Sequence, residues 1–304
     1  MKNSEEIVDN YIKEHLDDEF ERVQDYSYLD IRSNPSIDAC KKEWLSLANT
    51  NKQWTFSNIV KHFHQSICFA NNRNSLSPFA GWDKIRHDKA LFEKLLRNRL
   101  TYNESFIKFG IPDKIPLYIY AQGMGVMRWY KEVTYFKPSL AKRLINTYLS
   151  DAEWILDPFS GYSGRMLGAL ACGKKYCGGD LCKISVHESN EIYNWINDNF
   201  DNSQPIPPAY IEYADAETTQ TDTFDALLTC PPYEDIESWP GVNGNIRTCD
   251  EWIAICLKNN KCKDYIFVVD DKIEKYKPYI VETLNNKSHF GTNAEYVVHI
   301  RGNS

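Results

Sequence analysis

The sequence has 304 residues, 42% of them hydrophobic and 25% charged, which is the composition of an ordinary globular protein with a sizeable core. Its formal net charge of −7 argues against a protein that coats nucleic acid non-specifically, although a local basic surface is still compatible with it. No apolar run of about eighteen residues is present and the N-terminus lacks a signal-peptide pattern, so we expect a cytoplasmic protein.

The nine cysteines contain no C-x-x-C pair and no framework spacing, which predicts reduced thiols used as small apolar side chains. His62, His64 and Cys68 lie close enough in sequence to suggest a metal site. The surrounding segment fits better as a helix with a mixed surface, so no metal is expected.

The first half of the chain is predicted to be helical. Apolar residues have helical spacing over residues 4–24, and two further helices are expected near 36–48 and 55–70. A helix-turn-helix is the less favoured interpretation of that pair. An amphipathic helix covers residues 88–100, and the basic residues around it are candidate phosphate contacts: Lys84, Arg86, Arg97 and Arg99.

A boundary is expected at the proline-containing segment 109–116, "FGIPDKIP". Residues 1–115 would then form a helical region that recognises the target, and residues 116–304 a catalytic domain.

The second half alternates helices and strands. Strands are predicted at 153–159, 175–181, 209–215, 224–230, 264–271 and 295–301, with helices at 139–149, 164–173, 183–200 and 249–260. This alternation predicts an α/β fold with a doubly wound, mostly parallel sheet, Rossmann-like and covered by helices on both faces.

Ligands of such sheets bind beyond the carboxyl ends of the strands, and the residues at those ends are distinctive here. Asp157, Gly161 and Gly164 follow the first strand, and the glycines allow close approach of the backbone to a ligand. Asp180 ends the second strand, where it can accept hydrogen bonds from ribose hydroxyls, and Asp215 ends the third, where it can meet an adenine amino group. The glycine spacing matches neither a P-loop nor the dinucleotide fingerprint. A nucleoside ligand is therefore predicted.

The motif "DPFSGYSG" at 157–164, followed by "TCPPY" at 229–233, resembles the S-adenosylmethionine-dependent amino-methyltransferases of DNA. The upstream "TYFKPSLAKRLI" resembles the segment that, in this family, precedes the cofactor loop and helps to hold the methionine end of the cofactor. The likeness covers roughly residues 130–304. It implies S-adenosyl-L-methionine as the cofactor and the following cofactor-binding residues: Tyr135, Phe136, Lys137, Pro138, Asp157, Pro158, Phe159, Ser160, Gly161, Gly164, Asp180, Leu181, Asp215, Ala216 and Thr229.

The same resemblance assigns the catalytic corner to Cys230, Pro231, Pro232 and Tyr233. It implies that the Pro231 carbonyl and the side chain at 230 accept hydrogen bonds from an exocyclic amine, while the Tyr233 ring stacks on a base flipped out of the DNA. Position 230 departs from the family, which has Asp, Asn or Ser there. Because "TCPPY" is nearest to "TSPPY", a form associated chiefly with cytosine-N4 enzymes, cytosine N4 is preferred over adenine N6.

Several alternatives stay open on the sequence alone. The acceptor could be an RNA base or a protein amide nitrogen, since any planar amide-like nitrogen fits such a corner. Cys230 could be a covalent nucleophile for carbon-5 chemistry, although the C5 family places its cysteine after a proline. A catalytically silent protein that binds nucleic acid is the remaining interpretation. The expected partner is double-stranded DNA, and the sequence leaves a restriction-nuclease partner open.

Overall fold

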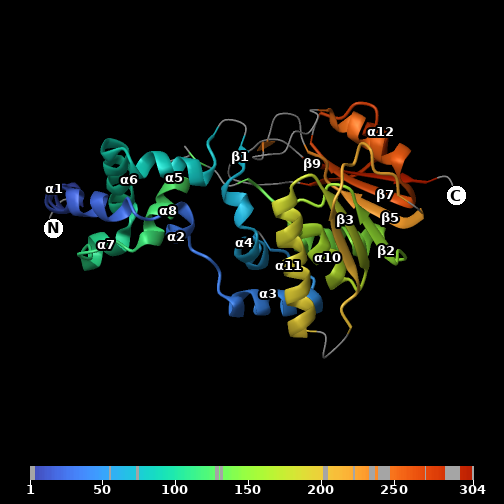
Figure 1. The fold of residues 1–304 in the computed structure, drawn as a ribbon, viewed down its shortest axis with the longest axis horizontal. Helices are drawn as coiled ribbons and strands as arrows, with labels where there is room; N and C mark the ends of the chain where they lie inside the picture. Colours follow the sequence, from blue (N-terminus) through green and yellow to red (C-terminus); the bar gives the residue numbers. More distant parts are fainter. Residues whose placement is uncertain are drawn as a thin grey trace. The chain divides into compact units, whose positions relative to one another are not determined.

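The computed structural model describes residues 4–54, 56–72, 75–126, 130, 133–200, 205–221, 223–232, 237–238, 247–270, 272–284 and 295–302 (Figure 1). Contacts divide the chain into two compact units. The helical unit consists of Met1–Asn34, Ile67–Val133 and Ser238–Pro240, and the α/β unit of Pro35–Ser66, Thr134–Glu237 and Gly241–Ser304. None of the helices in the described ranges is both long and apolar enough to span a membrane.

This division differs from the expected boundary between residues 115 and 116. Residues 35–66, here called the arm, belong with the α/β unit although they precede most of the helical unit in sequence. The Nζ of Lys142 donates to the carbonyls of Leu47, Ala48 and Thr50, at the end of the first arm helix. A lysine there satisfies carbonyls that the helix itself leaves without partners. Helical periodicity predicts that a helix forms but not which core it joins.

The α/β unit contains a seven-stranded sheet in the order β4-β3-β2-β5-β7-β9-β8. The strands β4, β3, β2, β5 and β7 run parallel, whereas β9 is antiparallel to both of its neighbours. The predicted α/β fold with a mostly parallel sheet is confirmed. Its strands are β2 (Trp154–Asp157), β3 (Lys175–Asp180), β4 (Ala209–Tyr213), β5 (Thr223–Thr229), β7 (Lys261–Val269), β8 (Ile280–Leu284) and β9 (Glu295–Arg301).

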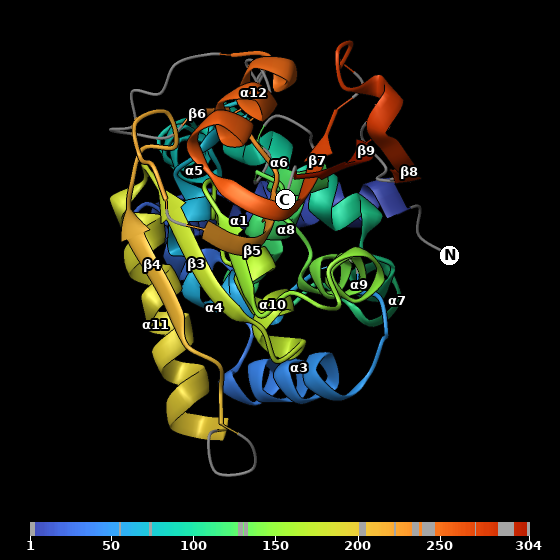
Figure 2. The same cartoon turned by 90° about the vertical axis from the view of Figure 1, so that its right-hand side faces the viewer.

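Helices cover both faces of this sheet. Figure 2 shows α12 on one side, and α10 and α11 on the other. Ile253 and Cys256 of α12 form a buried core with Leu227 and Phe267 of the sheet. The helices of the unit are α3 (Ile37–Asn49), α4 (Asn58–Phe63), α9 (Pro138–Tyr148), α10 (Gly164–Ala171), α11 (Lys183–Phe200) and α12 (Cys249–Asn259). The chain also contains four short segments: the 3₁₀ turns Gln65–Cys68 and Lys277–Tyr279, and the strands β1 (Asn71–Asn72) and β6 (Glu237–Ser238).

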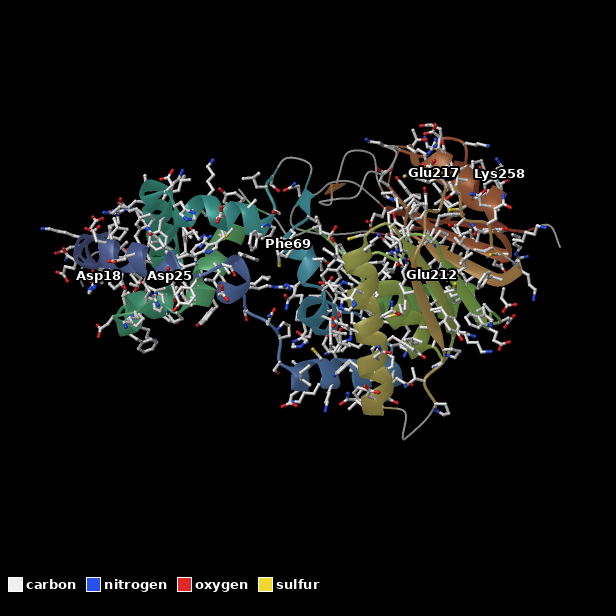
Figure 3. All side chains as sticks on the ribbon, in the orientation of Figure 1. Asp18, Asp25, Phe69, Glu212, Glu217 and Lys258 are labelled. Atoms are coloured by element: carbon white, nitrogen blue, oxygen red, sulfur yellow. The ribbon has the colours of Figure 1, made fainter. Side chains whose placement is uncertain are left out.

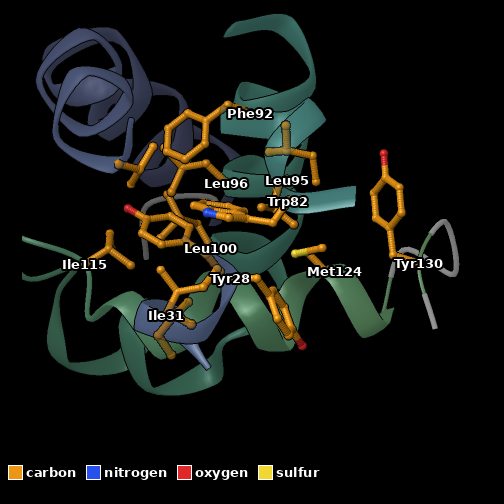
Figure 4. Packing of buried hydrophobic residues seen from close by; sticks show 14 of the residues in the cluster. Tyr28, Ile31, Trp82, Phe92, Leu95, Leu96, Leu100, Ile115, Met124 and Tyr130 are labelled. Atoms are coloured by element: carbon orange, nitrogen blue, oxygen red, sulfur yellow. The ribbon is translucent and has the colours of Figure 1, made fainter. Parts of the chain in front are cut away.

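The helical unit has a core of its own, in which Trp82, Phe92 and Tyr120 are fully buried (Figure 4). Its second stabilising feature is the buried carboxylate of Glu19, which accepts hydrogen bonds from the Tyr120 hydroxyl at 2.7 Å and the Ile115 N–H at 3.0 Å. The helices are α1 (Ser4–Val23), α2 (Tyr28–Ile31), α5 (Pro78–Arg86), α6 (Lys89–Tyr102), α7 (Glu104–Phe109) and α8 (Leu117–Val126).

Candidate functional site

The candidate site lies at the carboxyl edge of the parallel strands. From β2 the chain continues to β3 and β4 on one side, and then returns to β5 and β7 on the other. Asp157 is in register with Gly178, and Leu156 with Leu227, so Asp157, Asp180 and Thr229 end three adjacent strands at one edge. A reversal of strand order is where open α/β sheets form a crevice for ligands.

The side chain of Asp157 is fully buried at this edge and holds it together. Its Oδ1 accepts from the Thr229 hydroxyl at 2.6 Å and the Phe159 N–H at 3.3 Å. Its Oδ2 accepts from the Arg165 Nε and the Tyr176 hydroxyl, both at 2.7 Å. A carboxylate has about four acceptor positions, and four donors occupy them. Asp157 is therefore a positioning residue whose carboxylate has no acceptor position left for a ligand.

Arg165 is the positive partner of this carboxylate. Its guanidinium is buried, donates from Nη2 to the Phe159 carbonyl and lies 5.0 Å from the centre of the Phe136 ring. Burial, the largest single influence, lowers the pKa of Arg165, but Asp157 together with Cys230 and Tyr176 outweighs it, and the pKa is raised above its usual value. The sequence left open whether Arg165 binds a phosphate or covers its helix; in the structure it holds the loop segment 157–164.

The loop segment 157–164 turns back at Gly161, whose φ of +56° favours glycine. The Gly161 N–H donates to Oδ2 of Asp180 at 2.9 Å, and the Cys182 N–H donates to Oδ1 of the same carboxylate at 2.8 Å. Burial raises the pKa of the Asp180 carboxyl. Two donors leave about half of its acceptor positions available, so Asp180, unlike Asp157, can still bind a hydroxyl of a ligand.

Gly164, at the start of α10, allows the segment before α9 to reach the loop. A Cβ built at Gly164 would lie 1.8 Å from the carbonyl oxygen of Phe136, so no larger side chain fits. Lys137 caps α9 and Pro138 begins it. Tyr135 is held from the arm, because its hydroxyl accepts from the Ser57 N–H at 2.7 Å. The structure thus brings the predicted 135–138 segment against the predicted loop.

The residues that follow β4 are held by α12. Oδ1 of Asp215 accepts from the Glu217 N–H at 2.9 Å, and Asn259 Nδ2 donates to the carbonyls of Ala216 at 3.1 Å and Glu217 at 2.9 Å. Arg247 forms a two-pronged ion pair with Glu217, which Figure 3 labels. Because Asp215 accepts a single bond here, its carboxylate keeps capacity for a ligand amino group.

The proline corner follows β5. Thr229 is buried, Cys230 half-buried, Pro231 buried and Pro232 exposed. Tyr233, to which the resemblance gives a stacking role, lies outside the described residues. Through its bond to Thr229, Asp157 connects the loop segment 157–164 directly to the residue before this corner.

Sequence reasoning missed a buried polar network that supports the loop from the arm. His64 is fully buried, with Nδ1 2.9 Å from Glu188 Oε2 and Nε2 2.7 Å from Ser163 Oγ. Ser163 has a φ of +62°, which is strained for a residue with a side chain. Its hydroxyl also donates a hydrogen bond to the hydroxyl oxygen of Ser189 at 2.7 Å. The network therefore holds a strained residue in the loop. The sequence carried no signal for it, because His64 and Glu188 are 124 residues apart.

Two buried polar atoms near the loop, Ser160 Oγ and Trp252 Nε1, have no hydrogen-bond partner among the described residues. Trp252 packs edge-on against Phe159 at a ring distance of 4.9 Å. Buried polar atoms normally have hydrogen-bond partners, so the capacity of these two for a hydrogen bond is not used by the described part of the protein. Of the remaining predicted residues, Pro158, Phe159 and Leu181 are half-buried.

The two histidines of the suggested metal site bind protein groups. His62 Nδ1 lies 2.7 Å from the Pro35 carbonyl, while His64 faces Glu188 and Ser163. Within the described ranges, no group of three or more metal-binding side chains comes together. All nine cysteines are described, and none forms a disulfide.

No protein-family model matches the sequence, and no curated protein matches it either. Solved structures with a similar fold include magnesium protoporphyrin IX methyltransferase from Synechocystis with bound S-adenosylmethionine, at 10% identity and a TM-score of 0.40, covering 54% of this chain and 77% of that one. A protein from Pyrococcus horikoshii, provisionally described as an RNA methyltransferase, has 13% identity and a TM-score of 0.39, covering 54% and 82%. The 23S rRNA methyltransferase ErmE has 11% identity and a TM-score of 0.38, covering 54% and 68%. Values this low say nothing about the reaction of this chain, which has to be inferred from its own residues.

Replacing His64 with alanine tests the arm network. The change leaves the Ser163 hydroxyl and the Glu188 carboxylate short of a buried partner, so we expect the free energy of unfolding to fall by about 2–4 kcal/mol. His62→Ala is the matched control, with an expected loss of about 1 kcal/mol or less, since only one bond to a carbonyl is removed. Urea unfolding of both variants measures this, and equal losses would contradict a special role for His64.

Proposed function

We propose that this chain is an S-adenosylmethionine-dependent methyltransferase that modifies an exocyclic amine of a base in DNA, cytosine N4 in preference to adenine N6. The observation that carries the proposal is the 2.6 Å hydrogen bond between Thr229 Oγ1 and Asp157 Oδ1. It joins the start of the glycine-containing loop, at Asp157, to the start of the Thr-Cys-Pro-Pro corner, so the two motifs singled out in the sequence meet at one edge of the sheet.

The residues at this edge fit the proposed cofactor. Asp180 keeps acceptor positions for ribose hydroxyls, Asp215 keeps them for the adenine amino group, and the orphaned Ser160 hydroxyl offers a further hydrogen bond. The segment 135–138, packed on Gly164, would hold the methionine end. When bound, S-adenosylmethionine supplies an electrophilic methyl group on a sulfonium centre.

The proline corner supplies hydrogen-bond acceptors. An exocyclic amine is a poor nucleophile because its lone pair is delocalised into the ring, and acceptors for its two hydrogens favour the pyramidal, reactive nitrogen. In the proposed site these are the Pro231 carbonyl and the side chain at 230. Two consecutive prolines and the anchored Thr229 fix the backbone, so the acceptors need little rearrangement during the reaction.

A base paired within duplex DNA does not expose its amine to such a corner, so the proposal includes flipping of the target base out of the helix. Support for DNA as the acceptor comes from the combination of the "DPFSGYSG" and "TCPPY" motifs. Support for cytosine N4 comes from the single-atom difference between the Cys at 230 and the serine of the "TSPPY" form.

The purified protein, methyl-labelled S-adenosylmethionine and unmethylated DNA test this function. We expect label in N4-methylcytosine after digestion to nucleosides and mass spectrometry, because the corner is built for an amine. Label in N6-methyladenine would keep the mechanism and overturn the choice of base. Label only in RNA or protein acceptors, or in no acceptor, would refute the DNA enzyme.

Cys230→Ser separates amine chemistry from covalent catalysis. Oxygen is a better hydrogen-bond acceptor than sulfur, so we expect methyl transfer to be retained or to rise several-fold. Loss of at least about 100-fold would instead indicate a thiolate nucleophile and C5 chemistry. Cys172→Ser is the matched control, since that half-buried thiol donates to the Lys142 carbonyl, at 3.6 Å, on the arm side of α10.

A further inference from the structure

The basic residues around α6 are not equivalent in the structure. Arg97 is paired with Asp9 and, at 3.2 Å, with Glu93. Arg86 donates to Asp83 at 3.0 and 2.7 Å. Both guanidinium groups therefore already have a carboxylate partner within the helical unit, and a phosphate would have to compete for them.

Arg99 is different, because it is half-buried and no carboxylate among the described residues pairs with it. Its Nε is buried and has no partner within the part of the chain that the structure describes, and its Nη2 donates to Gln122 Oε1 at 3.1 Å. The side chain lies close over α8, where a Cβ built at Gly123 would come within 2.5 Å of the Arg99 Cγ. The guanidinium is thus held between α6 and α8, and its Nε–H is one of the donors left unused by the described residues.

The pKa values of Arg97 and Arg99 are shifted in opposite directions, which also distinguishes Arg99 from the paired arginine. Hydrogen bonds to Asp9 and Glu93 raise the pKa of Arg97, whereas burial lowers the pKa of Arg99, and no charged group among the described residues offsets it. A partly desolvated cation without a counter-charge is unfavourable unless an anion joins it. The arrangement favours binding of an anion beside Arg99.

Two exposed tyrosines flank this position. Tyr102 is three residues after Arg99 on α6 and is 71% exposed, while Tyr118 is four residues before Gln122 on α8 and is 46% exposed. Residues three and four apart lie on the same face of a helix, so Tyr102 shares a face of α6 with Arg99, and Tyr118 shares a face of α8 with Gln122. Arginine, glutamine and tyrosine side chains are common donors to the phosphates of DNA.

We propose that Arg99 and Gln122 form a phosphate-binding site for the DNA backbone, with the hydroxyls of Tyr102 and Tyr118 as further donors. The inference rests on the proposed function in taking DNA as the substrate. It sets Arg99 apart from Arg86 and Arg97, whose charges are already paired, and it assigns backbone binding to the helical unit.

Arg99→Gln tests this site, because it keeps a polar side chain of similar reach and removes the charge. The matched control is Arg97→Gln on the same helix, where Asp9 and Glu93 already neutralise the charge. Fluorescence anisotropy with a labelled duplex should show about 10-fold weaker binding for Arg99→Gln at ~100 mM salt. The slope of the logarithm of the binding constant against the logarithm of the salt concentration should become shallower by about one. Arg97→Gln should change the affinity less than about 2-fold.

Unchanged affinity and salt dependence in Arg99→Gln would overturn the proposal, and so would equal losses in both variants. Tighter binding of RNA than of DNA, lost in Arg99→Gln, would overturn the choice of DNA. Calorimetry with S-adenosylhomocysteine on the same preparations separates the two proposals. Intact cofactor binding with no DNA binding by the unmodified protein overturns both the phosphate site and DNA as the substrate. Methyl transfer to DNA with unchanged DNA affinity in Arg99→Gln overturns the phosphate site alone, whereas Arg99-dependent DNA binding without any methyl transfer supports the site and counts against the proposed reaction.

Discussion

The buried carboxylate of Asp157 is the interaction on which the candidate site depends. Its four donors come from the loop after β2, from the helix that follows, from β3 and from the end of β5. A buried charge is tolerated only when it is paired and hydrogen-bonded, and Arg165 provides the pairing. Removing either Asp157 or Arg165 would leave the charge of the other buried without a partner. The Asp157 carboxylate also links the end of β2 to Tyr176 of β3 and to Thr229 at the end of β5.

That fixed edge explains how the acids divide their roles. Asp157 uses its acceptor capacity within the protein, whereas Asp180 and Asp215 are held in place by backbone N–H groups and keep capacity for a ligand. The arm adds a second level of support, because His64 and Tyr135 connect it to the loop and to the segment before α9. The site is therefore built from parts of the chain that are far apart in sequence.

The sequence predicted the α/β unit well because its signals are local. Residues 183–200 were expected as a helix and form α11, and the strand ends at Asp157, Asp180 and Thr229 were identified because apolar runs end there. The short strand β8 was missed, since the half-buried pattern of Ile280–Leu284 does not stand out. The sequence also could not show that four protein donors occupy the Asp157 carboxylate, because a buried acid and a ligand-binding acid look alike in sequence. The cofactor-binding role expected for Asp157 stays a prediction.

The division into units could not be predicted for a related reason. An amphipathic helix shows that it has a buried face but not which core covers it, so the arm was grouped with the helices around it. The ion pairs of α6 are equally invisible in sequence, since Arg97 pairs with Asp9, 88 residues away. Long-range pairing decides which charges remain available for a ligand.

Calorimetric titration with S-adenosylhomocysteine, comparing the unmodified protein with Asp180→Ala, tests the central claim most directly. If the carboxyl edge is the nucleoside site, the unmodified protein binds one equivalent, and the variant binds roughly 10- to 100-fold more weakly because hydrogen bonds to a charged group are lost. No binding by the correctly folded protein, or equal affinity in Asp180→Ala, would contradict it.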